Sequence, residues 1–316
     1  MKKILFIRSD RFGEFLLSLY AVKLTRLNYP NSIIYMLAGK ENIELTKDVD
    51  FIDYFLEYKE DVFRGYKGSW RLGRLLRKER IDCVVILNPK KEFHLASFLA
   101  QVPLRVGYNR KWGFCLNKRI EDAKYLCKKH EAEYNIDLVS LICKDTFVPH
   151  LELPVEPLES LGFLGRELSL NDKYIVIHPF SSHSLKEIER EFWQRLIKRI
   201  KGKTRLKPVI VGAKDDKEES IEIQKDFDVL NLVGKLTLRN LAAFLSHCCS
   251  VFIGLDSGPM HLASMLKKPV VGLFRASNPT RWGPFATRAL VLEGKNINDF
   301  LSKIDNIVDF ITLTGC

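Results

Sequence analysis

The sequence lacks the marks of a disulfide-stabilised or thiolate-metal protein. Its seven cysteines are an odd number, and none forms a C-x-x-C pair. The adjacent residues Cys248 and Cys249 are unsuited to an ordinary disulfide. We therefore expect reduced cysteines that behave as small buried hydrophobes, in a reducing compartment.

Long apolar runs and the common glycine-rich phosphate motifs are also missing. No segment approaches the roughly 18 uninterrupted apolar residues that a spanning helix requires. The start of the chain resembles a signal peptide, but its apolar run ends at Arg8, which predicts a first strand instead. Neither G-x-G-x-x-G nor G-x-x-x-x-G-K-[ST] occurs. We expect a soluble or peripheral protein, located in the cytoplasm and possessing no P-loop or dinucleotide fingerprint.

What the sequence does contain is enough apolar material for two domains. Its 316 residues are 46% hydrophobic and 28% charged, which excludes a disordered tail protein or a mini-scaffold. The formal net charge of +11 favours an acidic partner, such as nucleic acid, a phosphorylated ligand or an anionic membrane face. Charge alone does not choose among these partners.

Short Ile- and Val-rich runs alternate with stretches of helical period, and the alternation occurs twice, which predicts two doubly wound α/β domains. The predicted strands are Lys3–Ile7, Ile33–Leu37, Ile52–Glu57, Cys83–Leu87, Arg105–Gly107, Tyr174–His178, Val209–Gly212, Val229–Leu232, Val251–Gly254 and Val270–Phe274. The predicted helices are Glu14–Leu27, Trp70–Glu79, Glu191–Ile200, Glu218–Lys225, Leu238–His247 and Met260–Leu266. Domains over 1–150 and 173–295 should face a central cleft, joined by a proline-containing linker over 151–172. A final helix within 296–316 could pack back on the N-terminal domain.

In such sheets ligands lie beyond the carboxyl ends of the strands, so residues that directly follow strands are the candidates for a site. The run GLDSGPMHLA, from Gly254 to Ala263, follows a strand and opens a helix. Ser257 and Gly258 would offer backbone N–H groups to a phosphate at the positive end of the helix. An ordinary helix cap with His261 as a neighbour explains the same residues equally well.

Two further polar clusters follow predicted strands. The run from His178 to Lys186 (HPFSSHSLK) could hold diphosphate oxygens, although a solvated loop explains it better when it is taken alone. The run from Arg8 to Leu16 (RSDRFGEFL) places Glu14 at a helix start. There it is either a partner for the helix dipole or a general base.

Taken together, these blocks resemble glycosyltransferase family 9, the lipopolysaccharide heptosyltransferases, which have a GT-B architecture of two facing Rossmann-like domains. The resemblance rests on four ordered blocks that span nearly the whole chain: 8–14, 178–186, 234–242 (GKLTLRNLA) and 256–274. It implies an inverting, metal-independent transfer of a heptose from ADP-heptose to an acidic lipopolysaccharide-core acceptor, with no cofactor. Another GT-B enzyme with a different nucleotide-sugar donor, or a non-catalytic family member, is the alternative.

The resemblance also implies roles for individual residues. Glu14, Lys186 and Asp256 would be catalytic, and Arg8, Asp10 and Arg11 would contact the acceptor. The donor contacts would be Ser181, Ser182, Lys186, Asp216, Leu236, Asp256, Ser257, Gly258 and His261. In this assignment Lys186 neutralises the leaving diphosphate, Asp256 holds sugar hydroxyls, and Asp216 and Leu236 lie near the nucleoside. Glu14 departs from the family's usual Asp, so it can act as the base only if its longer reach is accommodated.

Two competing interpretations are weaker. The D-x-D triplets 48–50 and 226–228 match the pattern of metal-dependent glycosyltransferases, but such triplets arise readily among 39 acidic residues. A nucleic-acid-binding protein would suit the positive charge, but no motif supports it. An acidic acceptor in an anionic membrane explains the basic residues better, with peripheral contact at the cytoplasmic face of the inner membrane.

Overall fold

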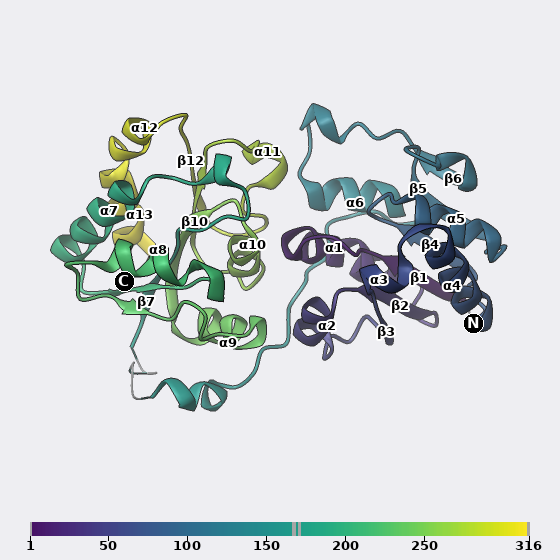
Figure 1. Ribbon diagram of the computed structural model, residues 1–316, viewed down its shortest axis with the longest axis horizontal. Coiled ribbons are helices and arrows are strands. Elements are labelled where there is room, and N and C mark those ends of the chain that lie inside the picture. The colour runs from purple at the N-terminus through teal and green to yellow at the C-terminus, as the bar shows by residue number, and fades with distance from the viewer. Residues whose placement is uncertain (1, 166–168, 170–171, 315–316) are drawn as a thin grey trace. The chain divides into compact units, whose positions relative to one another are not determined.

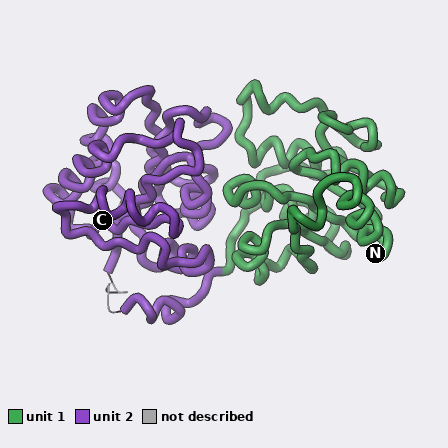
Figure 2. The backbone as a smooth tube through the Cα atoms, viewed as in Figure 1, with its two compact units in different colours: residues 1–154 green, residues 155–316 purple. Residues whose placement is uncertain are grey.

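The computed structural model describes residues 2–165, 169 and 172–314 (Figure 1). The chain divides into two compact units, residues 1–154 and residues 155–316 (Figure 2). Each unit contains a parallel six-stranded sheet with helices, which is the predicted α/β class.

The sheet of unit 1 has the strand order β3-β2-β1-β4-β5-β6. Its strands are β1 (Lys3–Ile7), β2 (Ile33–Ala38), β3 (Tyr54–Glu57), β4 (Cys83–Ile86), β5 (Leu104–Tyr108) and β6 (Lys118–Ile120). Its helices are α1 (Phe12–Asn28), α2 (Lys40–Thr46), α3 (Glu60–Phe63), α4 (Gly65–Lys78), α5 (Lys91–Leu99) and α6 (Glu131–Val139), with short 3-10 helices η1 (Gly113–Cys115) and η2 (Lys124–Leu126). Because strand side chains alternate between faces, Leu5 and Ile7 pack in one core with Leu72, Leu76 and Phe93 of α4 and α5.

The sheet of unit 2 has the order β12-β11-β10-β7-β8-β9. Its strands are β7 (Tyr174–His178), β8 (Lys207–Ile210), β9 (Leu230–Asn231), β10 (Cys249–Leu255), β11 (Val270–Phe274) and β12 (Ala289–Glu293). Its helices are α7 (Arg190–Lys203), α8 (Lys217–Gln224), α9 (Leu238–Cys248), α10 (Gly258–Met265), α11 (Pro279–Trp282), α12 (Ile297–Leu301) and α13 (Ile304–Thr314), with 3-10 helices η3 (Leu158–Leu164), η4 (Ser184–Lys186) and η5 (Lys214–Asp216).

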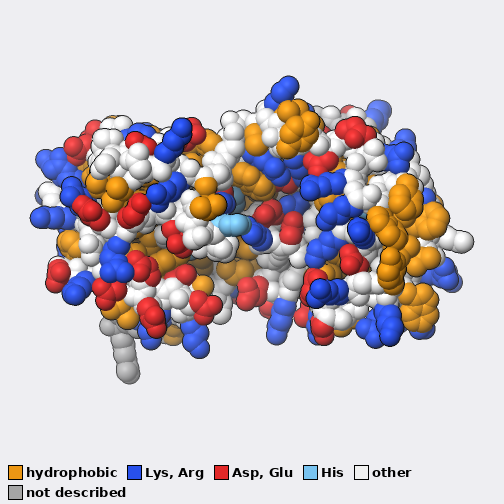
Figure 3. Space-filling model, turned by 45° about the horizontal axis from the view of Figure 1, so that its top comes forward, with side chains coloured by type: hydrophobic (Ala, Val, Ile, Leu, Met, Phe, Trp, Pro, Cys, Tyr) orange, Lys and Arg blue, Asp and Glu red, His pale blue; other side chains and the backbone are white. Residues whose placement is uncertain are grey.

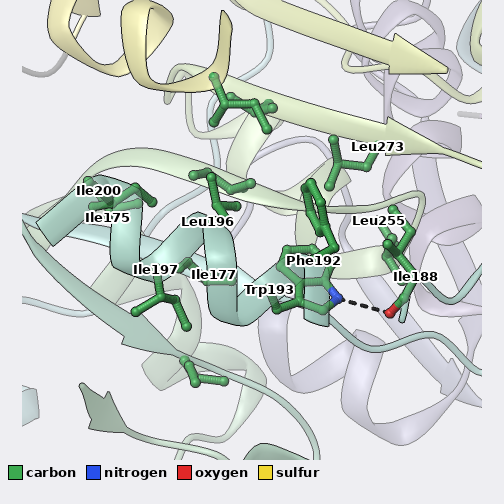
Figure 4. Packing of buried hydrophobic residues seen from close by; sticks show 14 of the residues in the cluster. Ile175, Ile177, Ile188, Phe192, Trp193, Leu196, Ile197, Ile200, Leu255 and Leu273 are labelled. Carbon is green, nitrogen blue, oxygen red and sulfur yellow. Dashed lines mark hydrogen bonds between the residues drawn. The ribbon is translucent and has the colours of Figure 1, made fainter. Parts of the chain in front are cut away.

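The core of unit 2 is built around α7. Phe192, Trp193, Leu196 and Ile200 of this helix are buried against β7 and its neighbours. Trp193 is fully buried, and its indole nitrogen donates a hydrogen bond of 3.2 Å to the carbonyl of Ile188, which removes the cost of burying the N–H (Figure 4).

The structure departs from the sequence interpretation at the sheet edges and at the tail. The edge strands β6 and β12 were not predicted. β6 (KRI) has two cations in three residues and therefore no apolar run, whereas β12 (ALVLE) contains an apolar run that the sequence interpretation overlooked. The single predicted final helix is wrong: the chain breaks between α12 and α13. The break leaves Phe300 and Ile307 both buried in the core of unit 2. Residues 315–316 of that prediction lie outside the described residues.

The segment that the sequence suggested as a linker, 151–172, contains ordered structure. Leu151 and Leu153 are buried, and η3 packs on α9. Glu156 forms an ion pair with Arg239, and its carbonyl lies 2.9 Å from Nε2 of His247. Residues 166–168 and 170–171 of the segment lie outside the described residues.

The six described cysteines are all free thiols, as expected. Five are buried and Cys127 is half-buried, while Cys316 lies outside the described residues. Burial raises the pKa of Cys83 and of Cys249 to about 12, although nearby lysines act in the opposite direction. These thiols are therefore inert packing groups.

Both sheets reverse their strand order next to the first strand of the unit. In unit 1 the reversal lies between β1 and β4, and in unit 2 it lies between β7 and β10. Ligands of doubly wound sheets bind outside the carboxyl ends of the strands at this point. The polar runs that begin at Arg8, His178 and Asp256 therefore occupy the positions where a ligand is expected.

The acid stability of unit 1 should depend on His94. This α5 residue is fully buried, neither ring nitrogen has a hydrogen-bond partner among the described residues, and burial, assisted by the charge of Lys111, lowers its pKa to about 4. The unfolded chain binds a proton at His94 more readily than the folded chain does. The free energy of unfolding therefore keeps its full His94 contribution above the unfolded pKa of about 6.5 and loses it as the pH falls towards 4. We expect the free energy of unfolding to fall by about 2 kcal/mol between pH 7 and pH 5 because of His94.

The measurement is urea unfolding of the wild type, His94→Leu and His150→Leu at both pH values. His94→Leu should flatten the pH dependence, whereas His150→Leu, a change at an exposed side chain, should not. A wild-type pH slope in His94→Leu would contradict the prediction.

Candidate active site

The N-terminus of α10 has no side-chain cap. Asp256 and Ser257 connect β10 to this helix, and Ser257 is its N-cap. The Ser257 side chain makes no capping hydrogen bond; instead its Oγ lies 3.3 Å from Nδ1 of His178, at the end of β7. Pro259 in the first turn has no N–H to satisfy. The first-turn N–H of Gly258 therefore lacks a side-chain cap, at the positive end of the helix dipole.

A buried carboxylate lies beside this helix end. Asp256 is 5% exposed, and its Oδ2 accepts a hydrogen bond of 2.6 Å from Nζ of Lys186, while its Oδ1 lies 3.5 Å from Nε2 of His261. Burial by itself would raise the pKa of Asp256, but the contacts with His261 and Lys186 outweigh it and lower the pKa to about 2. The carboxylate is therefore charged at neutral pH, and it joins Lys186, on the loop after β7, to α10.

The loop after β7 carries the two predicted serines. Ser181 is half-buried and accepts a hydrogen bond of 3.2 Å from the backbone N–H of His183, and Ser182 is exposed. Arg275, after β11, donates to the carbonyl of Glu187 at 2.6 Å and pairs with Glu189 at 3.0 Å. The loop is thus fastened on two sides, by Asp256 and by Arg275.

Asp216 and Leu236 follow the neighbouring strands β8 and β9. Asp216 Oδ2 accepts a hydrogen bond of 2.8 Å from the backbone N–H of Ala213, and burial raises the pKa of the carboxyl against that hydrogen bond. Gly234 has a φ of +74°, and a Cβ there would lie 3.1 Å from the Cα of Lys214, so the loops after β8 and β9 touch at a position that favours glycine. Half-buried Leu236 lies two residues further on.

Sequence reasoning gave no role of their own to two aromatic residues at this site, His178 and Trp282. His178 is 7% exposed, and burial lowers its pKa to about 4, so the ring near Ser257 is neutral at physiological pH. Half-buried Trp282, in α11, has its ring centroid 6.5 Å from that of His261. The position of His178 at the end of a predicted strand could have identified it as a site residue. Trp282 reaches His261 only through the tertiary fold, and no sequence pattern predicts this.

In unit 1, Glu14 lies in the first turn of α1, where it is half-buried. Arg11 is the N-cap of this helix, makes no capping hydrogen bond and is exposed. Asp10 retains 31% exposure of its side chain. These three residues have surface available to a ligand at the carboxyl end of β1.

Arg8, the other predicted acceptor contact, is 2% exposed and lies inside the unit. Its Nε lies 2.8 Å from Oδ1 of Asp10, and a terminal nitrogen lies 3.6 Å from Oε1 of Glu131. Glu131, the first residue of α6, also binds Nζ of Lys124 at 2.5 Å. Arg8 therefore has little surface for an acceptor and instead holds the Asp10 loop against buried Glu131, which the sequence analysis did not identify.

The described residues contain no group of three or more His, Cys, Asp or Glu side chains that could hold a metal ion. Of the D-x-D triplets, Asp50 pairs with Lys23 at 3.0 Å, and Asp226 is at a left-handed backbone position with φ of +69°. Within the described part of the chain, every helix is too short or too polar to traverse a bilayer.

The arrangement is similar to that of known glycosyltransferases. The lipopolysaccharide core heptosyltransferase OpsX of Haemophilus influenzae is 23% identical over 90% of this chain and 82% of that protein. The structure of Escherichia coli ADP-heptose LPS heptosyltransferase II aligns with a TM-score of 0.82 at 20% identity, covering 99% of this chain and 98% of that one. The E. coli heptosyltransferase WaaC with ADP-2-deoxy-2-fluoro heptose aligns with a TM-score of 0.72 at 15% identity, covering 98% and 99%.

The two Rossmann-like sheets are those of a GT-B fold. Residues 69–302 match the profile of glycosyltransferase family 9 (heptosyltransferase). Because that match covers most of the chain and includes both the Lys186 loop and the Asp256 helix end, the chain belongs to glycosyltransferase family 9, the heptosyltransferases.

Proposed function

We propose that this enzyme transfers a heptose from ADP-heptose to an acidic sugar of a lipopolysaccharide core, with inversion at the anomeric carbon and without a metal ion. The observation that carries the proposal is the contact of Lys186 with Asp256 beside the uncapped N-terminus of α10. A fixed cation and a helix dipole together suit a diphosphate leaving group. The relatives named above, one of which holds an ADP-heptose analogue, support the choice of donor.

On the donor side, Lys186 would contact the diphosphate. An ammonium group has three N–H donors, and two of them go to Asp256, to Oδ2 at 2.6 Å and to the backbone carbonyl at 3.4 Å. The third donor, the Gly258 N–H and the hydroxyls of Ser181 and Ser182 would then bind phosphate oxygens. The charge that develops as ADP departs would be stabilised by groups already in place.

Asp256 would have two functions. It positions Lys186, and because each carboxylate oxygen can accept more than one hydrogen bond, it can also accept from sugar hydroxyls. His261, on the other side of the carboxylate, would hold Asp256 in that orientation and border the sugar. Asp216 and Leu236, on the adjoining loops, would lie along the nucleoside.

On the acceptor side, Glu14 would act as the general base. It would take the proton of an acceptor hydroxyl while that oxygen forms a bond to the anomeric carbon and the bond from that carbon to the ADP oxygen breaks. A single displacement of this kind inverts the anomeric centre. Asp10 and Arg11 would contact the acceptor, and Arg8 would position Asp10 from within the unit.

The test of this function is transfer of labelled heptose to a lipopolysaccharide-core acceptor in excess EDTA, together with calorimetric titration of ADP, UDP and GDP. We expect transfer to persist without free metal and ADP to bind most tightly. Preference for UDP would assign a different donor, and activity that EDTA abolishes and Mg²⁺ or Mn²⁺ restores would contradict the metal-independent mechanism.

Replacing Lys186 should damage both stability and turnover, and the two effects should be separable. Lys186→Ala leaves the Asp256 carboxylate buried without its lysine, so we expect a loss of roughly 1–3 kcal/mol of unfolding free energy and of about 10²–10³ in kcat. Adding Asp256→Asn removes the buried charge, so the double variant should regain stability but not turnover.

The matched control is Lys207→Ala, which breaks an exposed lysine–aspartate pair with Asp172. It should leave both quantities nearly unchanged. If Lys186→Ala retains the wild-type kcat, Lys186 does not act on the leaving group.

Replacing Glu14 should separate donor binding from chemistry. Glu14→Gln keeps the size of the side chain but removes its proton affinity, so donor affinity should persist while single-turnover transfer falls by roughly 10²–10⁴-fold. Glu14→Asp should retain part of the rate. The control is Glu41→Gln, a change to another carboxylate in a first helical turn, that of α2, which should not affect transfer. A Glu14→Gln enzyme that transfers at the wild-type rate would leave Asp10 as the next candidate.

A further inference from the structure

Unit 1 exposes large aromatic and aliphatic side chains on neighbouring elements. We call this surface the α4–α5 face, and it comprises the exposed residues of α4, α5 and the 3-10 helix η1. Its apolar residues and their exposures are Tyr66 (74%), Trp70 (56%), Phe98 (51%), Leu99 (40%) and Phe114 (71%). These five residues do not contribute to the core, so burial of the core does not explain them.

Contacts connect these residues into one surface. The ring centroids of Tyr66 and Trp112 are 6.2 Å apart, and those of Trp112 and Phe114 are 5.8 Å apart. Arg77 of α4 donates a hydrogen bond of 2.6 Å to the carbonyl of Leu99, at the end of α5. Helices α4 and α5 pack against each other, and η1 packs against α5.

A stripe of positive charge borders the aromatic residues. Helix α4 contains five cations and no acidic residue: Lys67, Arg71, Arg74, Arg77 and Lys78. All five are exposed, and no carboxylate in the described ranges forms an ion pair with any of them. Lys67, Arg71, Arg74 and Lys78 follow i, i+4, i+7, i+11 spacing, so they lie on one side of the helix.

The opposite side of α4 is anchored in the core. Leu72 and Leu76 are buried there, so the packing of the core fixes which side of α4 faces solvent. Arg74 lies over the ring of Trp70, 4.8 Å from its centroid. Figure 3 shows apolar side chains beside Lys and Arg side chains on the part of unit 1 where α4 and α5 lie in Figure 1. The face is thus a surface in which a stripe of cations borders exposed aromatic rings.

We propose that the α4–α5 face docks on an anionic lipid bilayer. Tyrosine and tryptophan rings favour the level of the lipid headgroups, and lysine and arginine are attracted to anionic lipids. The side chains of Phe98 and Leu99 offer no hydrogen bond to a nucleic acid or a soluble saccharide. Their burial at the boundary between lipid headgroups and acyl chains is favourable. The proposal deepens the proposed function, because docking would bring the enzyme to a lipid-anchored acceptor, but it concerns a surface apart from the donor-binding residues.

The experiment is co-sedimentation of the full chain, without donor or acceptor, with vesicles of phosphatidylcholine alone or with about one third phosphatidylglycerol. We expect binding to the anionic vesicles and much weaker binding to the neutral ones. Binding should weaken when NaCl is raised from about 0.05 M to about 0.5 M. Equal binding to both vesicle types would overturn the proposal.

Charge reversal locates the surface. A cation near an anionic leaflet raises partitioning about fivefold, so Lys67→Glu with Lys78→Glu should lower it by about 25-fold or more. Lys198→Glu with Lys203→Glu, on exposed positions of α7 in unit 2, makes the same change in net charge and should have much less effect. Phe114→Ala should weaken binding severalfold at unchanged charge. Equal loss in both charge-reversal variants would show attraction by net charge alone and would contradict the assigned face.

Tryptophan fluorescence gives a second measure of contact. Brominated lipids in the anionic vesicles should quench the protein's emission, and Trp70→Phe should reduce that quenching while Trp282→Phe, in unit 2, does not. Quenching that is insensitive to Trp70 would place the contact elsewhere.

The docking and the proposed transfer can fail separately. If Lys67→Glu with Lys78→Glu transfers heptose normally to a delipidated core acceptor yet no longer binds vesicles, the docking surface is supported independently of the chemistry. If the wild type binds vesicles but transfers no heptose, the proposed function fails and the docking stands. Wild-type protein that binds single-stranded DNA more tightly than anionic vesicles would assign the face to nucleic acid instead.

Discussion

The buried carboxylate of Asp256 is the interaction on which the candidate site depends. Burying a charge is costly unless partners compensate it, and here Lys186 and His261 contribute from separate segments. The same contacts that keep Asp256 ionised also fix the loop after β7 against the start of α10. The contacts that stabilise the charge of Asp256 are therefore the same contacts that assemble the candidate site. They hold Lys186 in place without a ligand.

The N-terminus of α10 is also shaped by a side chain that binds a neighbouring segment. An N-cap serine usually satisfies the backbone of its own helix, but Ser257 lies against neutral His178 instead. The helix N-terminus consequently keeps its capacity to bind an anion. Unit 1 contains a parallel arrangement at the end of β1, where buried Arg8 joins the Asp10 loop to Glu131 and leaves Glu14 in the first turn of α1.

The two surfaces proposed for ligands differ in construction. Of the proposed donor contacts, Lys186 and His261 are held by ion pairs with buried Asp256 at the carboxyl ends of strands. The α4–α5 face is exposed and basic, and its individual contacts are weak, so its affinity for a bilayer would come from many similar contributions. The proposed soluble donor and the proposed membrane-anchored acceptor would place these different demands on one chain.

The sequence by itself determined the α/β class, the central strands β7 and β11 to the residue, and the clusters at strand ends, because local apolar periodicity and turn composition are written in consecutive residues. It also pointed to the family through its ordered motifs. The edge strand β6, the burial of Arg8 and the proximity of Trp282 to His261 were decided only by the tertiary structure. β6 (KRI) is short and has two cations, so no apolar pattern marks it. The partners of a buried charge lie far apart in sequence: 70 residues separate Lys186 from Asp256. Only folding brings such pairs together, and the residues adjacent to each partner in the sequence do not reveal the contact.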